Sequence, residues 1–129
     1  MGRTQNRPLP AGRISPLQAW IYALFLTITG IIVLLQVSGW LVLSLGLLAM
    51  LWYNVIYTYT KRLTAYAVIP GSVIGSIPPV IGWISGGGEP DDPRMIAMAI
   101  FFFIWQVPHF WLLMVKYGKD YERAGYPTL

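Results

Sequence analysis

"ISPLQAWIYALFLTITGIIVLLQVSGWLVLSLGLLAMLWYNVIYTYT", residues 14–60, contains no charged side chain, and this stretch decides the fold. As a single helix it would be about 70 Å long, whereas the hydrocarbon core of a bilayer is about 30 Å thick. The chain must therefore turn back within the stretch, and Ser38-Gly39 is the natural place for a turn. The whole sequence is 56% hydrophobic and only 11% charged, which indicates a membrane protein.

The uncharged windows predict one all-α domain over residues 1–129, a polytopic transmembrane helical bundle. The window 63–85 is long enough to cross a bilayer, but its prolines and glycines favour a broken or kinked helix. The loop "GGGEPDDPR" separates it from the last window. We therefore expect about four spans, near residues 17–37, 40–60, 63–85 and 95–116.

Basic residues are distributed unevenly in this four-span arrangement. The charged loop on one side holds Glu89, Asp91, Asp92 and Arg94, while the other cations fall on the opposite side, which we predict to be cytoplasmic. This asymmetry explains the basic character of the chain without a nucleic-acid partner. The absence of cysteine excludes disulfides and thiolate metal sites. The cations on the predicted cytoplasmic side are Arg3, Arg7, Arg13, Lys61, Arg62, Lys116, Lys119 and Arg123.

Polar side chains share a face on the last expected helix. At about 100° per residue, Gln106, His109, Lys116 and Asp120 lie within about 80° of one another if the helix continues past Gly118. Taken alone, a lysine near a span end is most simply a topology determinant or a headgroup contact. An ionisable residue inside a span, however, is a functional hypothesis. We therefore expect this polar stripe to serve a site.

The second expected helix repeats the pattern at the same end of the bilayer. Its residues Asn54, Tyr57, Thr58 and Lys61 cover about 100° of the cytoplasmic half.

Arg3 and Arg7 lie at that end too, and if their segment is helical they present two guanidinium groups in the same direction, a geometry suited to phosphate. A pocket that faces the cytoplasm, with cations and a carboxylate at its opening and apolar walls deeper in the bilayer, suits a ligand with an anionic head group and an apolar tail. An isoprenoid diphosphate fits this description.

Five motifs carry a family resemblance: "RTQNRPLPAGRISP", "YTYTKRLT", "GSIPPVIGW", "WQVPHFW" and "KDYERAGYP". Together they resemble the UbiA superfamily of membrane prenyltransferases, over nearly the whole chain from Arg3 to Pro127. "WQVPHFW" and "DYERAGYP" resemble its heme-modifying branch, the protoheme IX farnesyltransferases (heme O synthases), in particular.

The resemblance implies a bundle of about nine spans that transfers farnesyl from farnesyl diphosphate to a vinyl group of protoheme IX, giving heme O. It implies Mg²⁺ at the diphosphate, heme as substrate, handover of product to heme A synthase or a terminal oxidase, and a multi-pass location in the inner (plasma) membrane, or the mitochondrial inner membrane in a eukaryote. The superfamily's first Asn/Asp-rich motif lies upstream of the segment matched by "RTQNRP", so we expect this chain to be the central part of a larger protein.

The resemblance also implies a role for each candidate residue. Diphosphate would be held by Arg3, Arg7 and Lys61, and Mg²⁺ by Asp120 with Lys116 nearby. Asn54 and Tyr57 would line the prenyl entrance, while Gln106 and His109 would face the porphyrin, His109 as iron ligand or as polar partner.

Three alternatives stay open at the level of sequence. A superfamily member that prenylates an aromatic quinone precursor would share the basic mouth but gives no reason for "WQVPHFW". A fragment of a secondary transporter would explain a helix broken by Gly and Pro, although the two halves show no repeat. In a structural membrane subunit the polar stripes would be contacts between helices.

Overall fold

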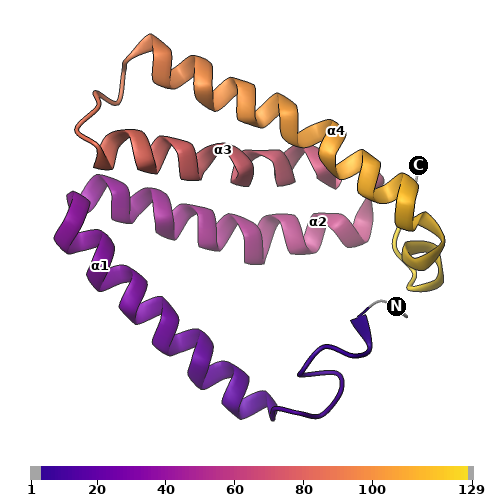
Figure 1. Cartoon of the computed structure of the whole chain (residues 1–129). Helices are drawn as coiled ribbons and strands as arrows, with labels where there is room; N and C mark the ends of the chain where they lie inside the picture. The colour runs from indigo at the N-terminus through magenta and orange to yellow at the C-terminus, as the bar shows by residue number, and fades with distance from the viewer. Residues whose placement is uncertain (1–3, 128–129) are drawn as a thin grey trace.

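The computed structural model describes residues 4–127, and all regular structure in that range is helical (Figure 1). This confirms the predicted all-α class. Arg3 lies outside the described residues. In chain order the elements are α1 (Pro16–Leu51), the π-helical turn η2 (Trp52–Tyr57), α2 (Thr58–Leu63), the 3₁₀ turn η3 (Ala65–Ala67), α3 (Val68–Ser85) and α4 (Pro93–Arg123).

The helix α1 begins at a capping box and is turned at one glycine. The Ser15 hydroxyl accepts from the Gln18 N–H, and the Gln18 side chain accepts from the Ser15 N–H, which satisfies two donors of the first turn. Gly39 has φ 75° and ψ −169°, a region essentially restricted to glycine. The chain therefore turns at the residue where the sequence predicted a turn. The first leg, residues 16–38, diverges from the second leg, residues 40–63 (Figure 1).

The second leg ends in two changes of helical geometry. Residues 52–57 form a π-helical turn, and α2 continues the leg as far as Leu63. Thr64 then has an extended backbone, and its hydroxyl accepts from the Tyr66 N–H at 3.2 Å. One 3₁₀ turn follows and leads into α3. The two legs and this corner position the site described below.

The prolines and glycines of residues 63–85 do not break the helix there; the extended residue of this window is Thr64, ahead of α3, and a kink stays a prediction. From Val68 to Ser85 the helix α3 is assigned as continuous, with Pro78 and Pro79 inside it. Hydrogen bonds tie both ends of α3 to the preceding helices, one at Trp52 in the second leg and the other at Ser38, just before the turn at Gly39. The Trp52 indole N–H donates to the Pro70 carbonyl at 2.8 Å, and the hydroxyls of Ser38 and Ser85 are 2.7 Å apart.

Asp92 caps the helix α4: its carboxylate accepts from the Arg94 N–H at 2.8 Å. The helix itself runs for 31 residues, Pro93–Arg123. Its length of about 46 Å exceeds the hydrocarbon core of about 30 Å. The helix continues past Gly118, which is the condition set by the predicted polar stripe. It lies beside α3 (Figure 1), and the Gln106 side chain lies against α3 at Gly75.

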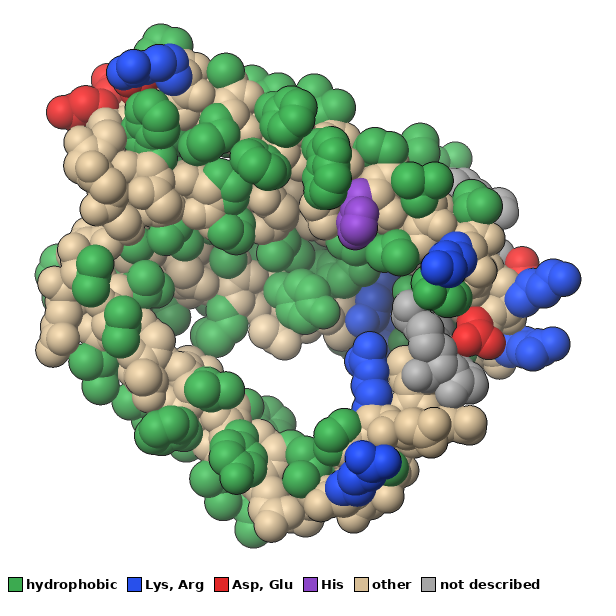
Figure 2. Space-filling view, viewed as in Figure 1, with side chains coloured by type: hydrophobic (Ala, Val, Ile, Leu, Met, Phe, Trp, Pro, Cys, Tyr) green, Lys and Arg blue, Asp and Glu red, His purple; other side chains and the backbone are tan. Residues whose placement is uncertain are grey.

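Large apolar side chains cover the outside of the molecule (Figure 2). In the first leg Trp20 is 75% exposed and Phe25 is 64% exposed, while the buried hydrophobic residues of the described range are few. Three helices are long and apolar enough to cross a bilayer: Pro16–Leu63, which contains the turn at Gly39, Ala65–Ser85 and Pro93–Arg123. The chain is therefore a multi-pass membrane protein, and the expected count of four crossings stays a prediction.

Candidate functional site

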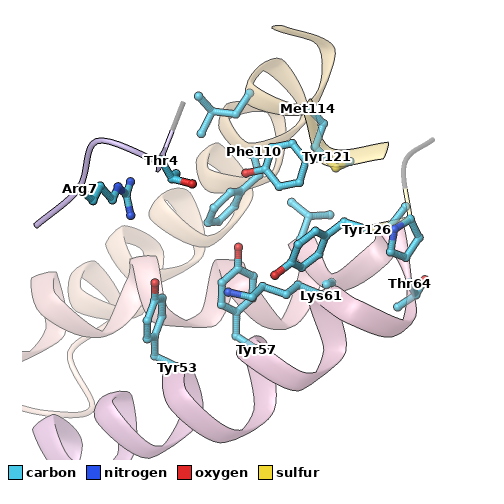
Figure 3. Close-up of a pocket in the computed structure, with 15 residues that line it drawn as sticks. Thr4, Arg7, Tyr53, Tyr57, Lys61, Thr64, Phe110, Met114, Tyr121 and Tyr126 are labelled. Atoms are coloured by element: carbon cyan, nitrogen blue, oxygen red, sulfur yellow. The ribbon is translucent and has the colours of Figure 1, made fainter. Parts of the chain in front are cut away.

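A cavity of about 260 Å³ lies where the N-terminal segment, the second leg, the corner before α3 and the far end of α4 meet (Figure 3). Its lining combines two cations with several tyrosines and an apolar wall. The lining residues are Thr4, Arg7, Tyr53, Tyr57, Lys61, Thr64, Ala65, Ala67, Val68, Phe110, Leu113, Met114, Tyr121, Tyr126 and Pro127.

The second leg contributes Tyr53, Tyr57 and Lys61, which are spaced four residues apart. Four residues overshoot a full α-helical turn of 3.6 residues, but the wider turn of a π-helix brings such residues closer to one line. The rings of Tyr53 and Tyr57 are 5.5 Å apart, and the Lys61 ammonium lies 5.5 Å from the centroid of the Tyr57 ring. Both rings project from this leg toward the segment that carries Arg7 (Figure 3). The second leg thus presents one row of two phenols and a cation.

The wall opposite this row is apolar and comes from α4. Phe110, Leu113 and Met114 line the cavity, and the Phe110 ring is 5.9 Å from the Tyr57 ring. Behind Tyr57 lies the backbone of α3 at Gly71, which is buried.

Two chain ends close the cavity on its remaining side. After α4 the chain turns through Gly125, at φ 74°, so that the Tyr126 N–H donates to the Tyr121 carbonyl at 3.0 Å. The rings of Tyr121 and Tyr126 meet edge to face at 5.9 Å. From the other end, the segment holding Arg7 is turned, since the Arg7 N–H donates to the Thr4 carbonyl at 3.2 Å. The cavity is therefore basic and hydroxyl-rich toward the chain ends and apolar toward α4.

Three of the predicted site residues, Arg7, Tyr57 and Lys61, line this cavity together. Asn54 does not line it, because its amide donates to the Met50 carbonyl at 2.8 Å within the same helix.

The polar stripe of α4 does not line the cavity either. Gln106 packs against Gly75, and His109 is exposed, with its ring stacked on Trp105 at 5.4 Å. Lys116 is exposed beside the Tyr117 ring, and Asp120 is half-buried next to Tyr121 in the sequence. The residues of α4 that line the cavity are centred roughly 80° around the helix from the stripe. The stripe therefore faces the edge of the cavity and the outside of the bundle.

Sequence reasoning missed Tyr53, Phe110, Tyr121 and Tyr126 as lining residues. The four-residue spacing of Tyr53, Tyr57 and Lys61 was a usable signal, because residues four apart lie about 40° from each other around a helix and share a face. Tyr121 and Tyr126 belong to the motif "KDYERAGYP", whose glycine before the second tyrosine was a signal for a turn back.

Metal-ligating side chains are sparse in the part of the chain that the structure describes. Residues 4–127 contain no group of three His, Cys, Asp or Glu side chains able to hold a metal ion. The last turns of α4 contain Asp120 and Glu122. Since Mg²⁺ in proteins is usually bound by carboxylates together with substrate phosphates, the described residues do not form a complete magnesium site.

The sequence of the chain is similar to that of known proteins. The profile of the UbiA prenyltransferase family matches residues 1–129. The chain is 46% identical to a protoheme IX farnesyltransferase of Geobacter sulfurreducens, over 98% of this chain and 47% of that relative. It is 40% identical to a protoheme IX farnesyltransferase of Aquifex aeolicus, over 100% of this chain and 44% of that relative. The chain thus spans about half the length of the curated relatives it matches. No solved structure matches it.

Proposed function

Since the chain belongs to the UbiA prenyltransferase family, we propose that the protein transfers farnesyl from farnesyl diphosphate to a vinyl group of protoheme IX and so makes heme O. The observation that carries this proposal is the cavity in which Arg7 and Lys61 meet aromatic and apolar walls. The printed activity of the relatives, protoheme IX farnesyltransferase, supports the choice of substrates.

The two cations account for the first half of the reaction. Farnesyl diphosphate loses its diphosphate when the allylic C–O bond breaks, and negative charge grows on the leaving group. Arg7 and Lys61 stabilise that charge, with Arg7 offering a planar fork of donors and Lys61 a compact ammonium. Lys61 is partly buried and rests over the Tyr57 ring, so its charge is screened less than that of a free surface lysine.

The aromatic side chains account for the second half. The departing diphosphate leaves a cationic allylic carbon, which the terminal carbon of the vinyl group attacks to form the new C–C bond. Water then adds to the other vinyl carbon, which has become cationic, and releases a proton. Tyr53, Tyr57 and Phe110 present rings toward the cavity, where they restrict access of water to the allylic cation. Premature capture by water would give free farnesol in place of heme O.

The remaining candidate residues receive roles outside the cavity lining. We assign His109, exposed and stacked on Trp105, to the porphyrin side, with Gln106 supporting that stretch of α4. Asp120 and Lys116 belong to the diphosphate end, and Arg3 stays a prediction. Asp120 is a single carboxylate and does not by itself amount to a Mg²⁺ site.

The location follows from the same proposal. A multi-pass protein with its cations gathered at one end, as Figure 2 shows, suits the inner (plasma) membrane with that end in the cytoplasm. The product would pass to heme A synthase or a terminal oxidase in the same membrane.

The test is analysis of products formed by the protein as its gene encodes it, in membrane vesicles supplied with Mg²⁺, farnesyl diphosphate and protoheme IX. The expected result is a product heavier than protoheme by one farnesyl group and one hydroxyl group. A prenylated quinone precursor, formed when a hydroxybenzoate replaces protoheme, would instead favour the aromatic-acceptor activity. Absence of both products would overturn the proposal.

A further inference from the structure

We propose that Gly71 is a positioning residue: its missing side chain lets the Tyr57 ring lie against the backbone of α3, and the ring in turn supports Lys61 in the cavity. The inference rests on the proposed function, because it assigns Gly71 a role in diphosphate binding although Gly71 does not line the cavity.

Space at Gly71 is fully taken by the Tyr57 ring. A Cβ atom built on Gly71 would lie 2.9 Å from Cε2 and 3.0 Å from Cδ2 of Tyr57, and 3.4 Å from Cε2 of Phe110. Real Cβ atoms essentially never approach as closely as the first distance, and the second is tighter than nearly all real contacts, so a residue with a side chain would displace the ring. Gly71 lies inside α3 with ordinary helical geometry, where any residue other than proline forms a better helix. The backbone conformation therefore gives no reason for glycine at this position, whereas the ring does.

The Tyr57 ring is held on three sides, so a displacement of the ring affects the remaining neighbour, Lys61. Its neighbours are the Tyr53 ring at 5.5 Å, the Phe110 ring at 5.9 Å and the backbone at Gly71. The fourth contact is the Lys61 ammonium, 5.5 Å from the ring centroid. A ring pushed away from α3 moves toward the cavity and takes away the surface on which Lys61 rests.

The same helix contains a matched control. A Cβ atom on Gly82 would meet nothing within 4 Å, and Gly82 has helical geometry like Gly71. Alanine at Gly82 adds the same atoms to α3 without touching the site. Any effect that Gly71→Ala shows and Gly82→Ala does not show comes from the local contact with Tyr57 and Phe110.

The experiment measures binding of farnesyl thiodiphosphate, an analogue with an inert leaving group, to the gene-encoded protein in lipid nanodiscs, together with the KM values for farnesyl diphosphate and protoheme. We expect Gly71→Ala to weaken analogue binding roughly tenfold or more, as for a lost hydrogen bond to a charged group. The KM for farnesyl diphosphate should rise in parallel while the KM for protoheme stays unchanged. Gly82→Ala should match the wild type in all three measurements.

A double-mutant comparison separates positioning from a general fault in folding. In a Tyr57→Ala background the ring is gone, so adding Gly71→Ala should change analogue binding little, and this double variant has no clash that would hinder folding. An equal loss with and without the ring would overturn the inference, as would wild-type affinity in Gly71→Ala. If the wild-type protein bound no analogue at all, the proposed function would fail together with this inference, whereas normal wild-type binding with an unaffected Gly71→Ala variant would remove the inference alone.

Discussion

Replacing Lys61 by methionine removes one positive charge from the cavity and keeps most of the length of the side chain. A hydrogen bond to a charged group is worth about 1.5–3 kcal/mol, and each 1.4 kcal/mol corresponds to about a factor of ten in affinity. Lys61 is partly buried and rests on the Tyr57 ring. Its contribution to binding is therefore taken as the free energy of a hydrogen bond to a charged group, which is larger than that of an exposed ion pair. We therefore expect Lys61→Met to bind farnesyl thiodiphosphate roughly 10- to 100-fold more weakly.

The neighbouring residue supplies the control. Arg62 is exposed and does not line the cavity, so Arg62→Met should weaken binding by less than about fivefold, in line with the value of about 1 kcal/mol or less for exposed ion pairs. The assay is calorimetric titration of the analogue into nanodiscs that contain each variant, at one fixed salt concentration. Equal losses for the two variants would mean that the analogue senses only the total charge of this end of the protein, and the cavity would not be its binding site.

Further predictions concern topology, the turn in α1 and the loop before α4. Single cysteines replacing Glu89 and Arg62 should be labelled from opposite sides of the membrane in intact cells, and labelling from one side would refute the predicted crossings. Gly39→Ala should destabilise the protein by about 1–3 kcal/mol in denaturant unfolding, because φ 75° with ψ −169° is essentially restricted to glycine; an unchanged midpoint would contradict this. The side-chain hydrogen bond from Arg94, followed by its backbone N–H, lowers the pKa of Asp92 below its ordinary value. The stability this provides is present above the unfolded pKa and lost as the pH falls through the lower folded pKa, so Asp92→Asn, which keeps the helix cap, should be less stable at neutral pH and converge on the wild type as acid protonates the carboxylate. A difference that stayed constant with pH would rule out the carboxylate charge as its source.

Much of the fold could be read from the sequence because a bilayer imposes simple rules. Residues 14–60 carry no charge and exceed one crossing, and Gly39 turns the chain where glycine is needed. The loop rich in glycine, proline and acidic residues marked the boundary before α4 in the same way, whereas the cap at Asp92 was not predicted.

The site was only partly predictable, because a helical wheel gives the angle between residues but not the neighbour that each face meets. The wheel grouped Gln106 with His109 correctly, yet α3 takes the side of α4 on which Gln106 lies and leaves His109 exposed. In the second leg the wheel put Tyr53 within about 40° of Tyr57, but only the neighbouring elements around the cavity identify Tyr53 as a lining residue. Packing between helices decides both outcomes, and a single sequence does not contain it in readable form.

The wide turn at residues 52–57 has a consequence for how this segment enters the bilayer. Side-chain donors reach carbonyls around it: the Thr58 hydroxyl donates to the Tyr53 carbonyl at 2.8 Å, and the Asn54 amide donates to the Met50 carbonyl at 2.8 Å. In hydrocarbon no water is present to hydrogen-bond the backbone carbonyls of an irregular helical turn. Side-chain donors form these hydrogen bonds instead. Each donor lies within five residues of its acceptor, so these hydrogen bonds do not depend on other helices. The segment can therefore insert into the bilayer with the turn already formed, before α3 and α4 pack against it.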